Sequence, residues 1–320
     1  MQLAQQILQE ELKEFESYFR ETVKSQVPLL DRILRYVVKT KGKQLRPAFV
    51  LLSAKLCGGV QPSTFRAASL VELLHTATLV HDDVVDESTE RRGFFSVYAL
   101  WKNKASVLVG DYLLAKGLSL SMDHNDIEVL HILSEAVKKM SEGELLQLEK
   151  SRLLNISEED YFTIITNKTA SLLASACAAG AFTASSDHGK RELMRQFGEY
   201  TGIAFQIKDD LFDYGTDDVG KPIGNDIREK KLTLPLIYTL KHAGAAERRK
   251  LIYAIRNRHQ DEQGIKEIIS AVQSAGGIQH ATDVMEAYKA KALDILNSFA
   301  PTQERDAMEE LVRYTTERKK

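Results

Sequence analysis

Apolar residues recur at helical spacing along almost the whole of this 320-residue chain, and clear alternating strand patterns are absent. Only 6 prolines and 18 glycines interrupt the periodicity, mostly where a helix can end. A helix with one apolar stripe must bury that stripe against other elements. The sequence therefore predicts an all-α protein.

The spacing predicts helices at roughly 3–24, 27–40, 44–57, 63–87, 104–122, 126–151, 157–184, 189–214, 231–243, 246–259, 262–275, 279–298 and 303–318. The longest loop-like segment is 215–231, whose glycines and charges are typical of a solvated connector, although it directly follows an aspartate cluster. No low-complexity linker or fixed-period repeat divides the chain. We therefore expect a single domain over residues 1–320.

Composition and charge narrow the function classes. The chain has 43% apolar and 28% charged residues and a formal net charge of −2, so no global field favours nucleic acid or an anionic membrane. The two cysteines, Cys57 and Cys177, stand in small apolar surroundings and indicate free thiols in a reducing compartment. There is no apolar signal core, and no apolar run approaches ~20 residues. We expect a cytoplasmic protein without nucleic-acid partners.

The first chemical signal is an aspartate cluster, HDDVVDE at 81–87, at the end of an apolar helical run. On a helix, Asp82 and Asp86 lie one turn apart on one face, where like charges repel by about 0.2–0.5 kcal/mol. The C-terminal end of a helix also disfavours negative charge. A bound Mg²⁺ relieves both effects, because it takes one or two carboxylates and completes its shell with water and substrate phosphates.

A second cluster, DDLFD at 209–213, repeats the pattern after the run GEYTGIAFQIKDD. One such cluster alone can be a solvated helix end. Two clusters of the same pattern favour an acidic cage for several Mg²⁺ ions and one diphosphate, if they face each other. The candidate metal ligands are Asp82, Asp83, Asp86, Asp209, Asp210 and Asp213.

Basic residues gather near the same helix ends, as a diphosphate requires. The segment KGKQLRP at 41–47 carries three cations, Arg91-Arg92 follows the first cluster, and His75 lies two turns before Asp82. Each has an ordinary interpretation, as an exposed loop pair or a core histidine. Their alternation with the acidic clusters indicates diphosphate binding. Further candidates are Lys168, Thr169, Gln206, Lys221, Lys230 and Lys231.

Six segments resemble, in order and spacing, the all-trans polyprenyl diphosphate synthase family, the relatives of farnesyl and geranylgeranyl diphosphate synthases. They are GKQLRP (42–47), LVHDDVVDESTERRG (79–93), VLVGDYLL (107–114), GELLQLE (143–149), KTASLL (168–173) and GIAFQIKDDLFDYGTDDVGKPIGNDIREKKLTLP (202–235). The resemblance implies the isoprenoid synthase fold, a bundle of antiparallel helices around a deep central cavity. It also implies a homodimer.

The resemblance implies a role for each matching residue. The positions that hold isopentenyl diphosphate are Lys43, Arg46, His75 and Arg92. Those on the side of the allylic diphosphate are Arg91, Lys168, Thr169, Gln206 and Lys231, with Lys221 as a further basic candidate. The principal ligands of about three Mg²⁺ ions are Asp82, Asp86 and Asp209, supported partly through water by Asp83, Asp210 and Asp213. Catalysis would rest on Asp82, Asp86, Arg91, Lys168 and Asp209.

The implied reaction begins when metal ions and cationic side chains stabilise the charge on a departing allylic diphosphate. The double bond of isopentenyl diphosphate then attacks the allylic cation, a proton is lost, and water must stay excluded.

Product length depends, in the family, on the residues four and five positions before the first aspartate. Here these are Thr78 and Ala77, both small, and helix geometry places only Thr78 on the Asp82 face. The resemblance therefore predicts a long product, about octaprenyl in length, for quinone side chains. The expected primer is farnesyl or geranylgeranyl diphosphate, and product release is expected to involve transient membrane contact. Replacing Ala77 with phenylalanine should shorten the product.

Two departures from the family pattern are present. Gly93-Phe94-Phe95-Ser96-Val97 stands where the family has a proline and a threonine, and Lys230 stands where it has a glycine. Four alternatives stay open: a farnesyl or geranylgeranyl diphosphate synthase, a class I terpene cyclase, a chain that needs a partner subunit, and a regulatory subunit without chemistry. The cations at positions 43, 46 and 92 disfavour the cyclase, and the two intact clusters disfavour the regulatory subunit.

Overall fold

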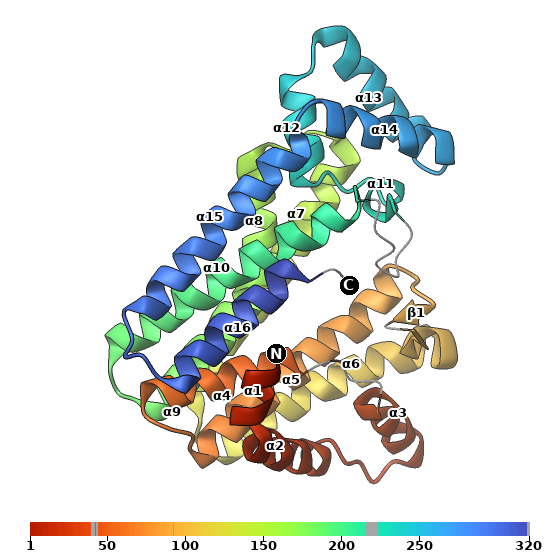
Figure 1. Ribbon diagram of the computed structural model, residues 1–320. Helices are drawn as coiled ribbons and strands as arrows, with labels where there is room; N and C mark the ends of the chain where they lie inside the picture. Colours follow the sequence, from red (N-terminus) through yellow and green to blue (C-terminus); the bar gives the residue numbers. More distant parts are fainter. Residues whose placement is uncertain (40–41, 43, 92, 216–222, 319–320) are drawn as a thin grey trace. The chain divides into compact units, whose positions relative to one another are not determined.

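The computed structural model describes the chain except residues 40–41, 43, 92, 216–222 and 319–320 (Figure 1). Helices dominate the described residues, which confirms the all-α class. The chain divides into two compact units. Unit 1 comprises Met1–Val137, Leu172–Arg195 and Phe299–Met308, and unit 2 comprises Lys138–Ser171, Gln196–Ser298 and Glu309–Lys320. The single domain and the central cavity expected from the sequence stay predictions.

Unit 1 holds the N-terminal helices and a short hairpin. Its elements are α1 (Gln2–Ile7), α2 (Gln9–Thr22), α3 (Pro28–Lys39), α4 (Leu45–Cys57), α5 (Pro62–Val85), β1 (Glu90–Arg91), β2 (Phe94–Phe95), α6 (Val97–Asp123), the first part of α7 (Ile127–Leu153), most of α9 (Ser171–Ala184), and the first turns of α10 (His188–Phe212) and α16 (Gln303–Glu317).

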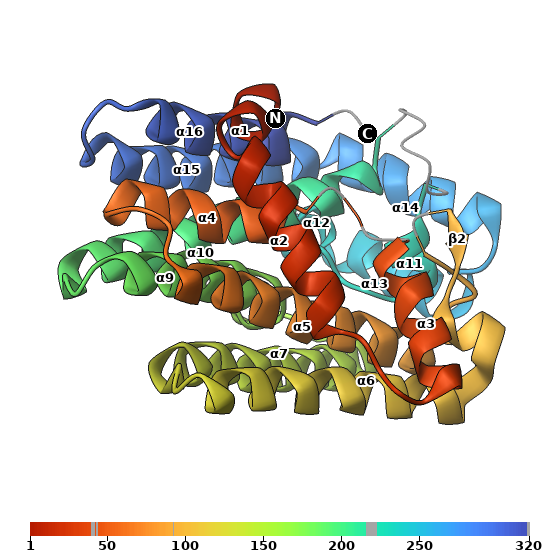
Figure 2. The same cartoon turned by 90° about the horizontal axis from the view of Figure 1, so that it is seen from below.

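Helices α5 and α6 make the most extensive contact in unit 1 and lie side by side in Figures 1 and 2. A Cβ added to Gly117 would lie 2.7 Å from Cδ1 of Leu70, and one added to Gly110 would lie 2.1 Å from Nε2 of His81. The two contacts run in opposite sequence directions, so the helices are antiparallel. Neither glycine has room for a side chain, which lets the two backbones approach closely.

The start of α6 and the hairpin before it differ from the sequence prediction. The strands pair antiparallel, with Glu90 opposite Phe95 and Arg91 opposite Phe94. Two residues per strand are too few for an alternating pattern to be visible. Helix α6 begins at Val97 rather than 104, because the Ser96 side chain accepts a hydrogen bond from the Ala99 N–H at 2.9 Å. Lys102 lies at φ 64° inside α6 and joins two helical stretches, the second of which corresponds to the predicted helix.

Two other predicted helices are divided in the structure. The helix predicted at 3–24 divides at Leu8 into α1 and α2. The helix predicted at 157–184 is α8 (Glu158–Ile165), a π-helix at Thr166–Ala170, and α9. A period near 3.6 does not reveal a single π-turn, which inserts one residue locally.

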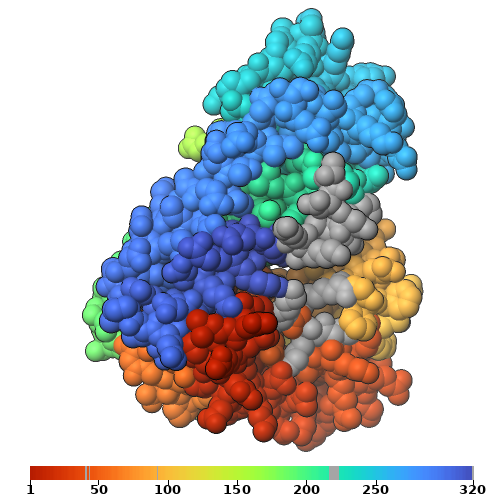
Figure 3. All heavy atoms as spheres, viewed as in Figure 1, coloured from red at the N-terminus to blue at the C-terminus, as the bar shows by residue number. Residues whose placement is uncertain are grey.

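Unit 2 holds α8, the π-helix, the remaining parts of α7, α10 and α16, and the helices of the C-terminal half: α11 (Asn225–Arg228), α12 (Leu234–His242), α13 (Ala245–Asn257), α14 (Glu262–Ser274) and α15 (Gly277–Asn297). Its core includes the fully buried side chains of Ile207, Tyr214, Leu234, Ile268 and Val272. Helices α13 and α14 pack together, and their atoms form the cyan and light-blue surface in Figure 3. Part of the connector predicted at 215–231 is helical, as α11, and its residues 216–222 lie outside the described residues.

Both cysteines are buried free thiols in unit 1. Burial raises the pKa of Cys57 to about 11 and that of Cys177 to about 12, so both stay protonated near neutral pH. The prediction of free thiols is confirmed. Among the described residues, no helix combines the length and the apolarity needed to cross a membrane.

Candidate active site

The first aspartate cluster lies where α5 ends. Helix α5 ends at Val85, and the N–H of Asp86 donates to the Asp82 carbonyl at 2.8 Å, which places these two aspartates one turn apart as predicted. Asp82 is half-buried and Asp86 is exposed. Two carboxylates at the negative end of the helix dipole form a suitable place for a hard cation.

Asp83 faces the protein instead. The residue is 2% exposed, and its carboxylate accepts a hydrogen bond from Nε of Arg91 at 2.7 Å. Burial raises the pKa of Asp83, and the nearby Arg91 guanidinium opposes that rise. The pair ties the first strand of the hairpin to the end of α5. The sequence predicted Arg91 as a diphosphate ligand, and its structural partner here is Asp83.

Arg46 and His75, both predicted for isopentenyl diphosphate, are brought together. Nη1 of Arg46, on α4, lies 2.8 Å from Nε2 of the buried His75 on α5. A guanidinium has only donors, so Nε2 must accept and the ring is neutral with its proton on Nδ1. His75 is therefore a core histidine that also orients a cation. The other two residues predicted for this substrate, Lys43 and Arg92, lie outside the described residues.

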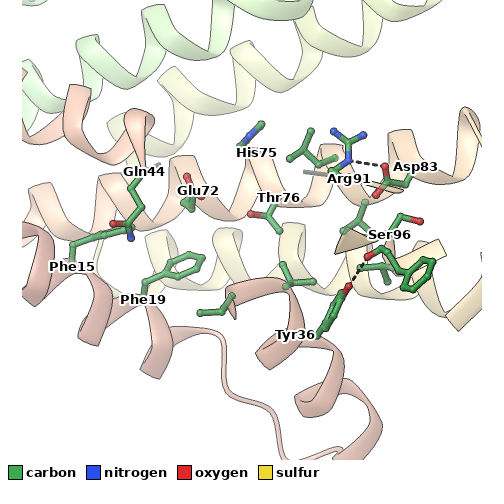
Figure 4. A pocket seen from close by; sticks show the side chains of 16 residues that line it. Phe15, Phe19, Tyr36, Gln44, Glu72, His75, Thr76, Asp83, Arg91 and Ser96 are labelled. Carbon is green, nitrogen blue, oxygen red and sulfur yellow. Dashed lines mark hydrogen bonds and ion pairs between the residues drawn. The ribbon is translucent and has the colours of Figure 1, made fainter. Parts of the chain in front are cut away.

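A pocket in unit 1 adjoins this pair (Figure 4). In Figure 4 the rings of Phe15 and Phe19 lie at one end, and the ion pair of Arg91 with Asp83 lies at the other. The pocket thus has an apolar end and an end that carries an ion pair. The remaining lining residues are Tyr36, Val37, Val38, Gln44, Glu72, His75, Thr76, Leu79, Val80, Phe95, Ser96 and Val97.

The two residues predicted to limit product length have different surroundings. Ala77 is fully buried. On α5 it shares a face with Leu70, Leu73 and His81, the side chains that lie nearest Gly110 and Gly117 of α6. Thr78 is half-buried, and its Oγ1 donates to the His75 carbonyl at 2.8 Å. Of the two, Thr78 is the one with exposed surface on the Asp82 side of α5, in line with the helical geometry.

The second cluster ends α10, and its three aspartates have different partners. Asp209 accepts from Nη2 of Arg318 at 2.7 Å. Asp210 is 5% exposed and accepts from the Tyr161 hydroxyl at 2.7 Å and from Nε2 of Gln206 at 2.8 Å. Burial, with Asp226 nearby, raises the pKa of Asp210 well above its usual range, although both hydrogen bonds oppose the rise.

Asp213 caps α11. Its carboxylate accepts the backbone N–H groups of Asn225 at 2.7 Å and Asp226 at 3.1 Å. Burial raises the pKa of Asp213, and these backbone hydrogen bonds oppose it. Burial beside Asp213 also raises the pKa of Asp226 to about 6, although Lys231 lowers it. The sequence interpretation had not singled out Asp226.

The π-helix carries Lys168 and Thr169. The hydroxyl of Thr169 donates to Oε1 of Gln206 at 2.7 Å, so the predicted pair meets and extends the network to Asp210. Two glycines hold this segment. A Cβ on Gly143 would lie 2.9 Å from the backbone nitrogen of Lys168, and a Cβ on Gly202 would lie 2.6 Å from Cα of Ala170. Single π-turns often occur at functional sites.

The remaining predicted cations in unit 2 have acidic neighbours. Lys168 forms an ion pair with Glu144 and lies 3.4 Å from Oε1 of Gln147. Lys231 forms an ion pair with Glu229. Burial alone would raise the pKa of Glu229, but Lys231 lowers it overall. The predicted residue Lys221 lies outside the described residues.

The described residues offer a divalent cation a small number of carboxylate ligands. Among them, no three histidine, cysteine or carboxylate side chains gather closely enough to hold a metal ion by themselves. Mg²⁺ needs only one or two carboxylates when waters and phosphates complete its shell. Asp82 and Asp86, one turn apart and accessible, form such an oxygen pair.

Several residues that shape these sites were absent from the sequence interpretation. Tyr161 and Arg318 contact the second cluster, Gly110 packs against His81 beside the first, and Glu144 pairs with Lys168. The glycines of the VLVGDYLL, GELLQLE and GIAFQ segments were a usable signal, because a glycine inside a helix weakens it unless close packing requires it.

The chain is similar to known proteins in sequence and in fold. The model of the family described as Polyprenyl synthetase matches residues 27–272. The octaprenyl diphosphate synthase of Escherichia coli (strain K12) is 34% identical over 300 residues, covering 93% of this chain and 93% of that protein.

Two solved structures extend the comparison. The polyprenyl synthase from Caulobacter crescentus CB15, complexed with calcium and isoprenyl diphosphate, has a TM-score of 0.91 and 34% identity, covering 100% of this chain and 98% of that chain. The geranylgeranyl pyrophosphate synthase from Bacteroides thetaiotaomicron has a TM-score of 0.84 and 38% identity, covering 99% and 98%.

Proposed function

This chain belongs to the polyprenyl synthetase family and is a transferase, and from this premise we propose that it is a long-chain trans-prenyl diphosphate synthase. Its substrates are isopentenyl diphosphate and a farnesyl or geranylgeranyl diphosphate primer. Its product is a polyprenyl diphosphate of about octaprenyl length, for quinone side chains. The observation that carries the proposal is the pair of aspartate-rich helix ends, each combining a half-buried carboxylate with an inner carboxylate held by protein donors.

The proposed metal is Mg²⁺, about three ions with diphosphate bound. The proposed ligands are Asp82, Asp86 and Asp209, with Asp83, Asp210 and Asp213 in support. When bound, the ions supply positive charge that stabilises the departing diphosphate. The calcium in the relative from Caulobacter crescentus supports a divalent cation.

The residues of the chain bind and orient the substrates in this proposal. The neutral ring of His75 accepts a hydrogen bond from the Arg46 guanidinium. The other N–H groups of that guanidinium then donate to the diphosphate of isopentenyl diphosphate. Lys168, Thr169 and Gln206 bind the allylic diphosphate, and the contact of Thr169 with Gln206 sets their spacing. Lys43, Arg91, Arg92, Lys221 and Lys231 are the further proposed phosphate ligands.

Turnover of an Asp82→Ala variant tests the metal assignment. Loss of one ligand should lower turnover by about a hundredfold or more, because metal charge stabilises the transition state by several kcal/mol. The exposed Asp123, on α6, provides the control Asp123→Ala, which should keep normal turnover. Near-normal turnover of Asp82→Ala at saturating Mg²⁺, with the fold intact by circular dichroism, would remove Asp82 from the proposed site.

The second candidate function is a geranylgeranyl diphosphate synthase, which the 38% identical structure from Bacteroides thetaiotaomicron favours. The small side chains of Ala77 and Thr78 favour the longer product. Chromatography of the products made from farnesyl and isopentenyl diphosphates by the purified chain decides between them. It also shows whether a partner subunit is needed. A product that stops at twenty carbons supports the second candidate.

Variants at the product-length positions sharpen this test. Thr78→Phe should shorten the product, whereas Thr78→Val, of similar size, should leave its length unchanged. Ala77→Phe adds a ring where the alanine is fully buried against α6, so part of its effect would be overpacking. Unchanged product length in Thr78→Phe would exclude Thr78 as a limit on the chain.

A second copy of this chain is the proposed partner. Helix α6 exposes a stripe formed by Leu108, Leu118 and Met122, which are 67%, 50% and 62% exposed. Their spacing places them within about 80° of one another around α6, on the side that also carries the exposed Asp111. Exposed apolar side chains gathered on one side of a helix are typical of an interface. A cytoplasmic location, with transient membrane contact during product release, completes the proposal.

A further inference from the structure

Arg318 lies directly after α16 and contacts one face of α10. Its Nη2 donates to Oδ1 of Asp209 at 2.7 Å, and its guanidinium carbon lies 4.6 Å from the ring centroid of Phe205 and 5.3 Å from that of Phe212. These three residues of α10 stand at i, i+4 and i+7 and therefore share a face. The residue directly after α16, a helix coloured dark blue in Figure 3, thus contacts the second aspartate cluster.

This contact leaves Arg318 incompletely paired. Its Nε is buried and has no hydrogen-bond partner among the described residues. A buried donor without an acceptor is unfavourable by about 1–3 kcal/mol. The interaction with Asp209 and the two aromatic rings therefore holds the guanidinium in a position that does not satisfy all of its donors.

Asp209 is also a proposed metal ligand, so two cations would use the same carboxylate. A divalent ion held by Asp209 would share that carboxylate with the guanidinium, and two positive charges on one carboxylate repel each other. The ring contacts keep Arg318 beside Asp209 when no metal is bound, since a guanidinium over an aromatic face is attracted to it.

We propose that Arg318 is a positioning residue that occupies Asp209 in the metal-free protein and competes with the divalent cation for it. The inference rests on the proposed function, because it takes Asp209 as a metal ligand. Arg318 holds the carboxylate while no metal is bound, and metal binding displaces Arg318 and loosens the last turn of α16.

The test is titration of metal-free protein with Mn²⁺, read by the electron paramagnetic resonance signal of the free ion, with and without inorganic pyrophosphate. Arg318→Gln should bind Mn²⁺ about two- to fivefold more tightly, the range expected when a partly exposed ion pair is removed. Arg318→Lys keeps the charge but loses the planar guanidinium, so its Mn²⁺ affinity should lie between those of the wild-type chain and Arg318→Gln.

Arg313→Gln, on α16 itself, is the matched control. Arg313 pairs with Glu309 and Glu317 and has no described contact with Asp209, so its loss should leave Mn²⁺ affinity unchanged. Hydrogen exchange of the wild-type chain provides a second measurement that needs no folded variant. Adding Mn²⁺ should speed amide exchange in the last turn of α16.

The outcomes distinguish the competition by Arg318 from the assignment of Asp209 as a metal ligand. If Asp209→Asn weakens Mn²⁺ binding but Arg318→Gln binds no more tightly than wild type, the competition is wrong and the metal assignment stands. Unchanged or slower exchange in the last turn of α16 would also overturn the competition. If Asp209→Asn binds Mn²⁺ like the wild-type chain, the assignment of Asp209 fails, and the inference fails with it.

Discussion

At the scale of single residues, the aspartates of each cluster have different tasks. The inner ones are held by protein donors: Asp83 by Arg91, and Asp210 by Tyr161. A buried carboxylate with such partners is fixed in orientation but has fewer lone pairs for a metal. The more accessible Asp82 is better placed for direct coordination. One sequence pattern thus provides both carboxylates that the protein holds and the proposed metal ligands.

The stability of unit 2 should depend on the ionisation of Asp226. Its folded pKa of about 6 is raised above the unfolded value of about 3.9, so its stabilising contribution is complete below about pH 4 and is lost as pH rises through 6. We expect the free energy of unfolding of the metal-free chain to fall by roughly 1–3 kcal/mol over this window.

Chemical denaturation at several pH values measures this dependence. Asp226→Asn should make it less steep, because asparagine cannot ionise, and the raised pKa values of Asp210 and Asp213 account for the dependence that remains. Asp294, exposed on α15 of the same unit, provides the control Asp294→Asn, which should retain the wild-type dependence. An equally steep loss of stability in Asp226→Asn would show that another group controls it.

At the scale of elements, glycines set how closely helices approach near the predicted site residues. Gly110 admits the His81 ring beside the first cluster, and Gly202 admits the backbone of the π-helix beside the second. Both glycines lie in helix interiors, where glycine is less favourable than alanine by about 1 kcal/mol. Close packing accounts for their presence.

Gly202→Ala should displace the π-helix. The added Cβ would lie 2.6 Å from Cα of Ala170, a backbone atom that cannot rotate away. We expect a loss of about 1–3 kcal/mol in unfolding free energy and at least about a tenfold loss of kcat/KM, because Lys168 and Thr169 move with the segment. Denaturation and steady-state kinetics check both. Gly189→Ala, exposed at the start of the same helix, should change neither appreciably. A fully active and stable Gly202→Ala would contradict this role of the glycine.

At the scale of the whole molecule, the proposed dimer depends on the exposed stripe of α6. Leu108→Glu places a charge at the most exposed residue of that stripe, where burial without a partner is unfavourable. We expect the mass measured by multi-angle light scattering to fall from that of two chains to that of one. Tyr253→Glu alters a side chain that is 62% exposed on α13 and should leave the mass unchanged. A dimer that persists in Leu108→Glu, or a monomeric wild-type chain, would rule out this interface.

The sequence by itself determined the all-α class, the approximate bounds of most helices and the family, because helical periodicity and motif order are local properties of the chain. It also placed Asp82 and Asp86 on one turn, which helix geometry alone dictates. The tertiary structure decided which residues meet: Arg46 with His75, Tyr161 with Asp210, and Arg318 with Asp209. Such contacts join segments 29 to 109 residues apart, and no local pattern encodes them. For the same reason the two-residue strands and the single π-turn became visible only in the folded chain.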